Sequence, residues 1–110
     1  MVQVGNETTG GFIGETNMQA MCKLFSAGSK GVKDYNSDVK VVIHVESPQK
    51  NTLTTWSDNL EKYNVNYDIL GTSYYPYWHG TLSNLKKELS YVQTKHNKDA
   101  MVVETSYAYT

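Results

Sequence analysis

Short apolar runs rich in β-branched residues alternate along this chain with longer stretches in which apolar residues recur at helical spacing. The runs begin near residues 1, 39, 67 and 100, so they are 38, 28 and 33 residues apart. Parallel strands joined by right-handed helical crossovers produce units of about 30 residues. Runs without polar alternation are typical of strands buried on both faces. The order therefore predicts an α/β fold with a parallel sheet, its strands at residues 1–4, 39–45, 67–70 and 100–103.

Three helices are predicted between these strands, each with one apolar stripe. Asn17, Thr52 and Thr81 stand just before the stripes, where a side-chain oxygen can accept a hydrogen bond from a free backbone N–H, so each is a predicted N-cap. The stripes consist of Met18, Met21, Cys22, Phe25 and Val32; of Leu53, Trp56, Leu60 and Tyr63; and of Leu82, Leu85, Leu89 and Val92.

For several side chains outside the functional candidates, the sequence predicts burial or exposure. Cys22 and Trp56 lie on apolar stripes, so we expect them to pack in the core. The charged run at residues 86–88, Lys-Lys-Glu, indicates a solvated helix face, and His96 is expected to be an exposed cation at a helix end.

The unit length also matches a (β/α)8 barrel, in which eight such units make about 250 residues. A free-standing sheet of four parallel strands would have to cover both faces with only three helices. Residue 1 lies inside one predicted strand and residue 110 just beyond another. We therefore expect residues 1–110 to be an incomplete part of one barrel domain.

Composition excludes several classes of function. The chain has a formal charge of −1, with 10 Lys+Arg against 11 Asp+Glu, which argues against a nucleic-acid partner held by bulk charge. No apolar run approaches the roughly 18 to 20 residues of a membrane span, and no signal-peptide pattern is present, so no membrane partner is predicted. The single Cys22 excludes an internal disulfide, and no residues have metal-ligand spacing, so neither a metal nor a cofactor is predicted.

Two carboxylates stand where apolar strands stop. Glu7 follows the first predicted strand and Glu104 follows the last. In a barrel of parallel strands both would project into the mouth at the carboxyl-terminal face, where active sites lie. Two carboxylates facing each other across a sugar carry out glycoside hydrolysis. The alternative is that these acids merely cap loops or pair with a neighbouring Lys.

Aromatic residues gather after the third and fourth predicted strands. Residues 71–80 read Gly-Thr-Ser-Tyr-Tyr-Pro-Tyr-Trp-His-Gly, and residues 106–109 read Ser-Tyr-Ala-Tyr. Aromatic faces at a barrel mouth can stack on sugar rings. Packing of one loop on the next is the structural alternative.

These motifs resemble the endo-β-1,4-galactanases of glycoside hydrolase family 53. The resemblance covers essentially the whole chain in the same order and spacing. The Gly-Asn-Glu turn is shared by a wide clan of retaining barrel glycosidases, whereas Ser-Tyr-Tyr-Pro-Tyr-Trp-His-Gly followed by Thr-Leu is much narrower. The matching segments are residues 2–7, 43–45, 67–82 and 102–105.

The resemblance implies a retaining hydrolase that acts on β-1,4-galactan or arabinogalactan side chains of pectin. The fold would be a partial (β/α)8 TIM barrel comprising approximately strands four to seven with the intervening helices. Glu7 would be the acid/base and Glu104 the nucleophile, with their carboxyl groups about 5 to 5.5 Å apart.

Six further residues are implied to line the substrate site. Asn6 would hydrogen-bond the sugar 2-hydroxyl, and His44 would line the site from within its strand. Tyr74 or Tyr75 would donate a hydrogen bond to the nucleophile, a choice that strand alternation leaves open because the strand end can be bulged. Trp78 and His79 are the expected substrate-binding side chains of the aromatic loop.

The sequence leaves alternatives to this interpretation. A non-catalytic carbohydrate-binding module or a structural α/β piece would also account for parts of the pattern, and a related barrel glycosidase could act on another β-1,4-glycan. By itself, the 110-residue chain is expected to have little or no activity, because other barrel units would complete the site. Secretion is expected from the size of a polysaccharide substrate.

Overall fold

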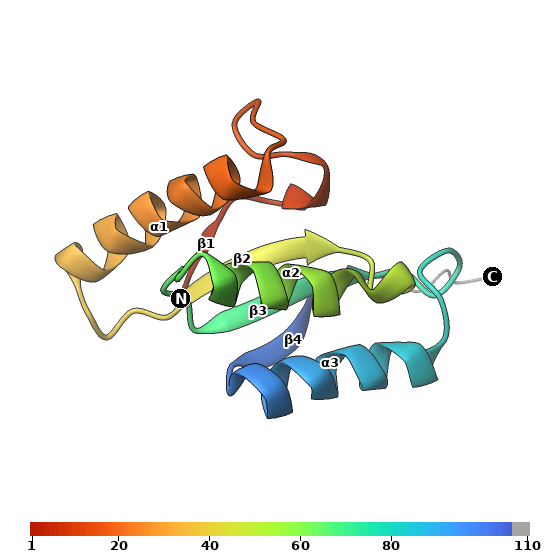
Figure 1. Ribbon diagram of the computed structural model, residues 1–110. Coiled ribbons are helices and arrows are strands. Elements are labelled where there is room, and N and C mark those ends of the chain that lie inside the picture. The colour runs from red at the N-terminus through yellow and green to blue at the C-terminus, as the bar shows by residue number, and fades with distance from the viewer. Residues whose placement is uncertain (107–110) are drawn as a thin grey trace.

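The computed structural model describes residues 1–106 and consists of strands alternating with helices (Figure 1). Within this range, the predicted order of strands and helices is confirmed. The strands are β1 (Val2–Val4), β2 (Val41–Glu46), β3 (Ile69–Tyr74) and β4 (Asp99–Thr105). The helices are α1 (Met18–Tyr35), α2 (Thr52–Lys62) and α3 (Leu82–His96), with 3-10 turns η1 (Thr8–Gly10) and η2 (Gln49–Asn51).

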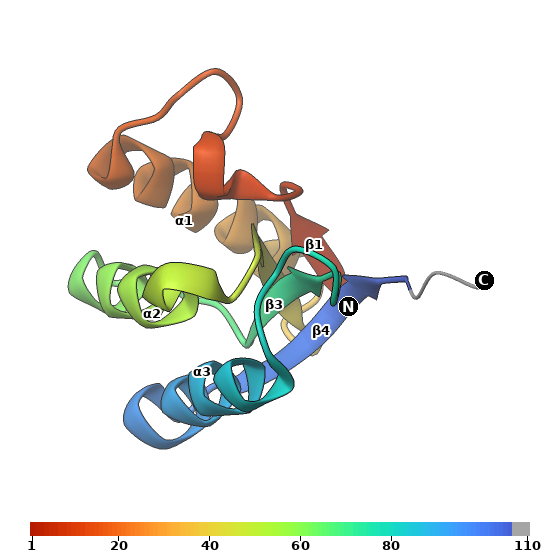
Figure 2. The same ribbon diagram turned by 90° about the vertical axis from the view of Figure 1, so that its right-hand side faces the viewer.

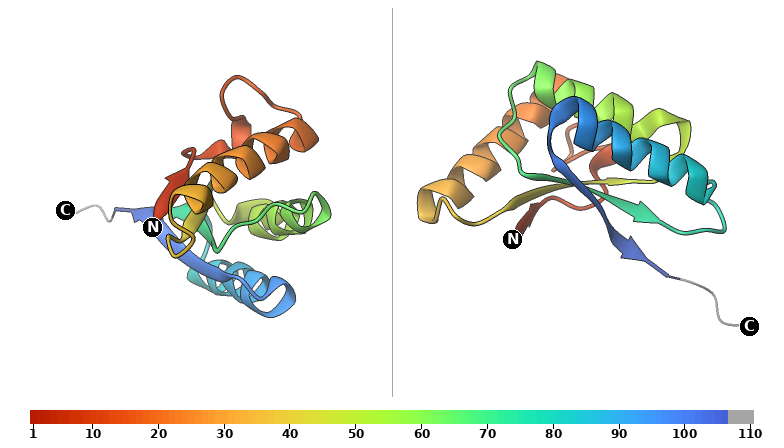
Figure 3. Two further views of the ribbon diagram at one scale, coloured as in Figure 1. Left: turned by 90° about the vertical axis from the view of Figure 1, so that its left-hand side faces the viewer. Right: turned by 90° about the horizontal axis from the view of Figure 1, so that it is seen from below.

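The sheet is parallel throughout, with strand order β1-β2-β3-β4. Val2 pairs with Val41, and Val42 pairs with Ile69, so neighbouring strands are in sequence order. The register between β3 and β4 shifts between Thr72 and Ser73. Figures 2 and 3 show α1, α2 and α3 on the same side of the sheet. Helices on one side of a curved parallel sheet are the arrangement of a barrel wall.

The core lies between this helical layer and the sheet. Phe25 and Trp56 are 0% and 4% exposed, and their rings meet edge to face at 6.1 Å. Cys22 is also buried, which confirms the packing predicted for it and for Trp56. The core continues into β2 through Val41, Ile43 and Val45.

β3 is longer than its apolar run predicts. The predicted strand ended at Leu70, but the observed strand continues to Tyr74 and is buried along its whole length. Residues 71–74 lack aliphatic side chains, yet their backbone pairs with β2 on one side and β4 on the other. Gly71 permits this close packing, because a Cβ there would lie 2.8 Å from Val103 Cγ1.

Two of the three predicted helix caps are confirmed. Asn17 accepts a hydrogen bond from the backbone N–H of Ala20, and Thr81 accepts one from that of Asn84. The prediction for Thr52 is wrong, because α2 begins at Thr52 itself and the Thr52 hydroxyl donates to Gln49 O at 2.6 Å.

The α2 N-terminus instead receives a carboxylate from α3. Glu88 was expected on a solvated face, but it is 1% exposed. Its oxygens accept hydrogen bonds from Thr54 N at 3.4 Å and Thr54 Oγ1 at 2.7 Å. The prediction for Glu88 was wrong because the charges beside it in the sequence, Lys86 and Lys87, face solvent while Glu88 faces α2.

His96 also differs from its prediction as an exposed cation. Its side chain is 2% exposed and lies between Asp58 Oδ1 at 2.8 Å and Glu61 Oε2 at 3.0 Å. These acids belong to α2, so His96 links the carboxyl ends of α2 and α3. Over residues 1–106, no helix combines the length and apolar character that crossing a membrane would require.

Candidate active site

The turn after β1 places Glu7 over the sheet. Gly5 has φ 83° and Glu7 has φ 45° and ψ 57°, so both lie in the left-handed region. That region is rarely occupied by residues other than glycine, and such backbone conformations cluster at functional sites. A Cβ on Gly5 would lie 2.8 Å from Thr8 Cγ2, so the turn requires glycine there.

The carboxylates of Glu7 and Glu104 converge at the carboxyl end of β3. Ser73 Oγ donates to Glu7 Oε2 at 3.1 Å, and the Tyr75 hydroxyl donates to Glu104 Oε1. Ser73 and Glu104 are also register partners on adjacent strands. Residues 97 positions apart in the sequence thus both lie beside Ser73.

His44 lies beneath the Glu7 turn with both ring nitrogens in contact with protein atoms. Its Nδ1 accepts from the backbone N–H of Glu7 at 3.3 Å, and Gln3 Nε2 lies 3.1 Å from the same atom. Asn6 Oδ1 is 3.2 Å from Nδ1. On the other side of the ring, Nε2 is 2.7 Å from Ser73 Oγ. At 1% exposed, the ring is enclosed by protein.

Burial and charge act in opposite directions on the ionisation of His44. Burial lowers the pKa of His44, and the carboxylates of Glu104, Glu7 and Glu46 raise it, but burial outweighs them and the pKa stays below its ordinary value. The neutral ring is therefore favoured. Its Nδ1 faces two donors, the Glu7 N–H and Gln3 Nε2, and one acceptor, Asn6 Oδ1, so a proton on Nε2 satisfies more of these contacts than a proton on Nδ1.

The structure distinguishes the two tyrosines that the sequence left open. Tyr75 contacts Glu104, whereas the Tyr74 hydroxyl donates to Gly80 O at 2.9 Å and its side chain is buried. The hydrogen bond to Glu104 is the main cause that raises the pKa of Tyr75 to about 12. The Tyr75 hydroxyl therefore keeps its proton at neutral pH.

The aromatic loop exposes Trp78 and Tyr77 to solvent. Trp78 stacks on Tyr75 with 5.6 Å between ring centroids and remains 62% exposed. His79 is only 8% exposed, and its Nδ1 accepts a hydrogen bond from Tyr75 N at 3.0 Å. Trp78 is thus available for stacking, whereas His79 holds the loop. The predicted aromatic residues Tyr107 and Tyr109 lie outside the described residues.

A hollow of about 470 Å³ adjoins this loop. It opens at the carboxyl end of the sheet, and most of its lining is polar. The residues that line it are Thr9, Glu46, Ser47, Gln49, Thr52, Trp78 and His79.

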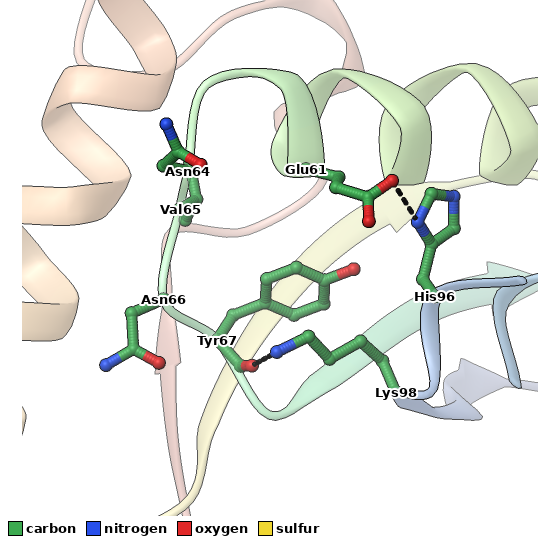
Figure 4. Close-up of a pocket in the computed structure, with 7 residues that line it drawn as sticks. All are labelled: Glu61, Asn64, Val65, Asn66, Tyr67, His96 and Lys98. Carbon is green, nitrogen blue, oxygen red and sulfur yellow. Dashed lines mark hydrogen bonds and ion pairs between the residues drawn. The ribbon is translucent and has the colours of Figure 1, made fainter.

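A second hollow, of about 310 Å³, lies at the opposite end of the sheet, where β3 and β4 begin (Figure 4). Its polar groups already contact one another, because Glu61 contacts His96 and Lys98 Nζ donates to Tyr67 O at 2.8 Å. The carboxylate pair is at the other end, so this hollow is not the candidate site. Within the part of the chain that the structure describes, no cluster of three or more His, Cys, Asp or Glu side chains could hold a metal ion.

Sequence reasoning missed Ser73 and Gln3, which join the predicted residues into one network. Ser73 contacts both Glu7 and His44, and Gln3 contacts both Asn6 and His44. Ser73 begins the Ser-Tyr-Tyr motif, but a small hydroxyl residue has no local pattern that indicates its partner.

Known proteins resemble this chain along its whole length. The family model of Glycosyl hydrolase family 53 matches residues 1–110. An endo-beta-1,4-galactanase of Bacillus subtilis is 49% identical over 111 residues, which are 100% of this chain and 26% of that protein. An arabinogalactan endo-beta-1,4-galactanase of Cellvibrio japonicus is 32% identical over 123 residues, covering 100% of this chain and 32% of that protein.

The structural comparison agrees with the sequence comparisons. The Ignisphaera aggregans GH53 catalytic domain superposes with a TM-score of 0.91 and 33% identity, covering 100% of this chain and 32% of that chain. This chain therefore spans about a quarter to a third of the relatives it matches. The match confirms the prediction of a partial (β/α)8 barrel. On the family model, the sequence identities and the fold, the chain belongs to Glycosyl hydrolase family 53.

Proposed function

We propose that this chain supplies the two catalytic carboxylates of a retaining endo-β-1,4-galactanase. The observation that carries the proposal is the convergence of Glu7 and Glu104 at one strand end, each oriented by a hydroxyl donor. The relatives of Bacillus subtilis and Cellvibrio japonicus are named as galactanases, which supports β-1,4-galactan or arabinogalactan as substrate.

The proposed reaction has two steps. Glu104 attacks the anomeric carbon as Glu7 transfers its proton to the departing glycosidic oxygen, so the C–O bond to the leaving sugar breaks and a covalent galactosyl-enzyme forms. Glu7, now ionised, then takes a proton from water, which attacks the anomeric carbon and releases Glu104. The Tyr75 hydroxyl contacts Glu104 in the free protein and orients its attacking carboxylate.

The remaining predicted residues divide by exposure. Asn6 and Trp78 are exposed, and we assign them to direct substrate contact, Asn6 through a sugar hydroxyl and Trp78 through stacking. Tyr74, His44 and His79 are buried and hydrogen-bonded to protein atoms, and we assign them to shaping the site from below.

The proposal extends to the whole domain. Residues 1–110 would be one part of a single catalytic barrel, and the remaining barrel units would complete the substrate cleft. The 110-residue chain alone would then have little or no activity. Because a polysaccharide cannot readily enter cells, we propose that the enzyme acts outside the cell.

A chimeric barrel tests this function. The chain replaces the matched segment of the Bacillus subtilis endo-beta-1,4-galactanase, which is 49% identical to it. The chimeric barrel should hydrolyse β-1,4-galactan with retention at the anomeric carbon, measured by proton NMR of the first products. Glu7→Gln and Glu104→Gln should each remove nearly all activity.

The control is Asp38→Asn, which neutralises an exposed carboxylate on the turn before β2 and should leave activity unchanged. Hydrolysis that survives both Glu7→Gln and Glu104→Gln would contradict the proposal. Binding of galactan without hydrolysis, insensitive to both substitutions, would indicate a carbohydrate-binding protein. A panel of mannan, xylan and β-glucan tests the assignment of galactan.

A further inference from the structure

A closed ring of hydrogen bonds begins and ends at Glu7. The Glu7 backbone N–H donates to His44 Nδ1 at 3.3 Å, and His44 Nε2 lies 2.7 Å from Ser73 Oγ. Ser73 Oγ in turn donates to Glu7 Oε2 at 3.1 Å. The ring passes through the β1 turn, β2 and β3, so it joins three consecutive barrel units.

The donors and acceptors of this hydrogen-bond ring are assigned by starting from the Glu7 backbone N–H, which can only donate. Nδ1 of His44 faces two donors, the Glu7 backbone N–H at 3.3 Å and Gln3 Nε2 at 3.1 Å, and one acceptor, Asn6 Oδ1 at 3.2 Å. We take Nδ1 as the acceptor, because this satisfies both donors, and the imidazole proton is then on Nε2. His44 Nε2–H therefore donates to Ser73 Oγ, which leaves the Ser73 hydroxyl proton to point at Glu7 Oε2. Because the backbone of Glu7 is left-handed, its N–H reaches His44 while its side chain reaches Ser73.

Burial of Ser73 and His44 restricts how this hydrogen-bond ring can rearrange. Ser73 is 0% exposed and His44 is 1% exposed, so neither group can exchange its partner for bulk water. A buried donor without an acceptor is unfavourable, and reversing the bonds would put a proton on His44 Nδ1 and leave the Glu7 backbone N–H without its acceptor. The carboxylate oxygen that Ser73 meets is therefore fixed as an acceptor.

We propose that Ser73, directed by His44, is a positioning residue for Glu7: it reserves Oε2 as an acceptor and leaves Oε1 as the oxygen that exchanges the proton with the glycosidic oxygen. This inference rests on the proposed function, in which Glu7 is the acid/base. The proton leaves Oε1 as the glycosidic C–O bond breaks, and in the second step Oε1 takes a proton from water. Ser73 keeps its own proton in both steps.

Leaving-group dependence separates this role from general support of the fold. A dinitrophenolate departs without protonation, whereas an unactivated alcohol requires the proton of the general acid. In the chimeric barrel, Ser73→Ala should lower kcat/KM for β-1,4-galacto-oligosaccharides about tenfold or more, and for a dinitrophenyl β-galactobioside by less than about threefold. An equal fall for both substrates would overturn the proposal.

Thr72→Val is the matched control. It removes a buried hydroxyl from the adjacent position of β3, and the hydrogen bond of that hydroxyl is to Ser73 O at 3.3 Å rather than to Glu7. It should leave the ratio of the two kcat/KM values unchanged. A change of that ratio as large as that of Ser73→Ala would overturn the proposal, because any loss within β3 would then produce it.

A measurement on the unsubstituted chimeric barrel does not depend on how Ser73→Ala folds. Nitrogen-15 NMR of histidine, with the His44 signals assigned by their loss in His44→Gln, reports which ring nitrogen carries the proton. The expected result is a neutral ring with the proton on Nε2. A proton on Nδ1 alone would overturn the proposal, because the Ser73 hydroxyl would then be turned toward His44.

Glu7→Gln distinguishes failure of this inference from failure of the proposed function. If Glu7 is the acid, Glu7→Gln removes hydrolysis of galacto-oligosaccharides but spares formation of the galactosyl-enzyme from the dinitrophenyl substrate. Absence of that pattern contradicts the proposed function itself. Its presence, together with an unchanged substrate ratio in Ser73→Ala, contradicts only the role of Ser73.

Discussion

Tyr74 and Tyr75 are adjacent and chemically identical, yet their hydroxyl groups have different partners. Tyr74 donates to a backbone carbonyl of its own loop, and Tyr75 donates to the carboxylate of Glu104 on the next strand. A tyrosine hydroxyl that donates to a carboxylate holds the orientation of that carboxylate. At this scale, the role of a side chain depends on which group it reaches rather than on its type.

Tyr75→Phe therefore tests the contact with Glu104. The substitution removes one hydroxyl, so we expect kcat of the chimeric barrel for galactan to fall roughly tenfold or more, as when one preorganised donor is lost from an active site. Steady-state kinetics measure the fall. Tyr74→Phe is the control and should reduce kcat much less, because the Tyr74 hydroxyl donates to Gly80 O rather than to Glu104. Equal effects would show that Tyr75 has no special relation to Glu104.

The ends of helices and strands in this fold are held by side chains from neighbouring elements. Glu88 of α3 serves the N-terminus of α2. Asp68, just before β3, accepts hydrogen bonds from Val41 N of β2 at 2.8 Å and from Lys33 Nζ of α1 at 2.8 Å. Such contacts fix how each helix sits on the sheet, and so how the strand ends of the site are aligned.

Glu88→Ala should destabilise the protein by about 1 to 3 kcal/mol, because it leaves the partly buried donors of Thr54 without an acceptor. Urea unfolding of the chimeric barrel measures the change. Glu88→Gln retains an acceptor oxygen and should lose less. Lys87→Ala, on the exposed face of α3, should have almost no effect. Equal stability of Glu88→Ala and Lys87→Ala would exclude a structural role for the buried carboxylate.

Asp68 should make stability depend on pH in the acidic range. Burial alone would raise the pKa of Asp68, but the hydrogen bonds from Lys33 and Val41 and the charges of Lys33 and Lys40 outweigh it and lower the pKa. A carboxyl group whose pKa is lowered by folding stabilises the folded state at pH values above its pKa in the unfolded state, which is about 4. This stabilisation is lost as the pH falls through the pKa of the folded state.

Asp68→Asn should therefore be less stable than the unsubstituted protein at neutral pH, and the difference should shrink as the pH falls below about 4. Thermal unfolding from pH 7 to acid measures it, with Asp38→Asn as the exposed control. A difference that does not vary with pH would show that the Asp68 effect is not due to its charge.

At the scale of the molecule, the helices cover one side of a curved sheet (Figures 2 and 3). The candidate carboxylates lie at the carboxyl end of the sheet. The opposite face of the sheet corresponds to the inside of a barrel wall, where the side chains of further strands would pack. Precise placement of two carboxylates depends on that packing, since small misplacements of reacting groups strongly reduce rates.

The isolated 110-residue chain should therefore hydrolyse galactan at least about a hundredfold more slowly than the chimeric barrel, since misplacement by about 1 Å alone can have that effect. Reducing-sugar release by equal molar amounts measures the difference. A crystal structure of the chimeric barrel should place the carboxyl groups of Glu7 and Glu104 about 5 to 5.5 Å apart. A separation of about 8 Å would instead fit an inverting enzyme. Full activity of the isolated chain would contradict the need for other barrel units.

The sequence by itself determined the alternation of strands and helices, the parallel sheet and the positions of Glu7 and Glu104 at strand ends. These features are local or periodic, so spacing along the chain is enough to predict them. The narrow aromatic motif also identified the family that the comparisons confirm. Asn17 and Thr81 were predictable as caps because an N-cap contacts residues only a few positions away.

Only the tertiary structure decided which side chains meet across elements. Ser73 and Glu7 are 66 positions apart, and Thr54 and Glu88 are 34 apart, so no local pattern indicates either contact. The choice of Tyr75 over Tyr74 lies just beyond the register shift after Thr72, where simple alternation no longer predicts direction. Burial of Glu88 and His96 likewise depends on how α2 and α3 pack, because a charged residue loses its contact with water only when another element covers it.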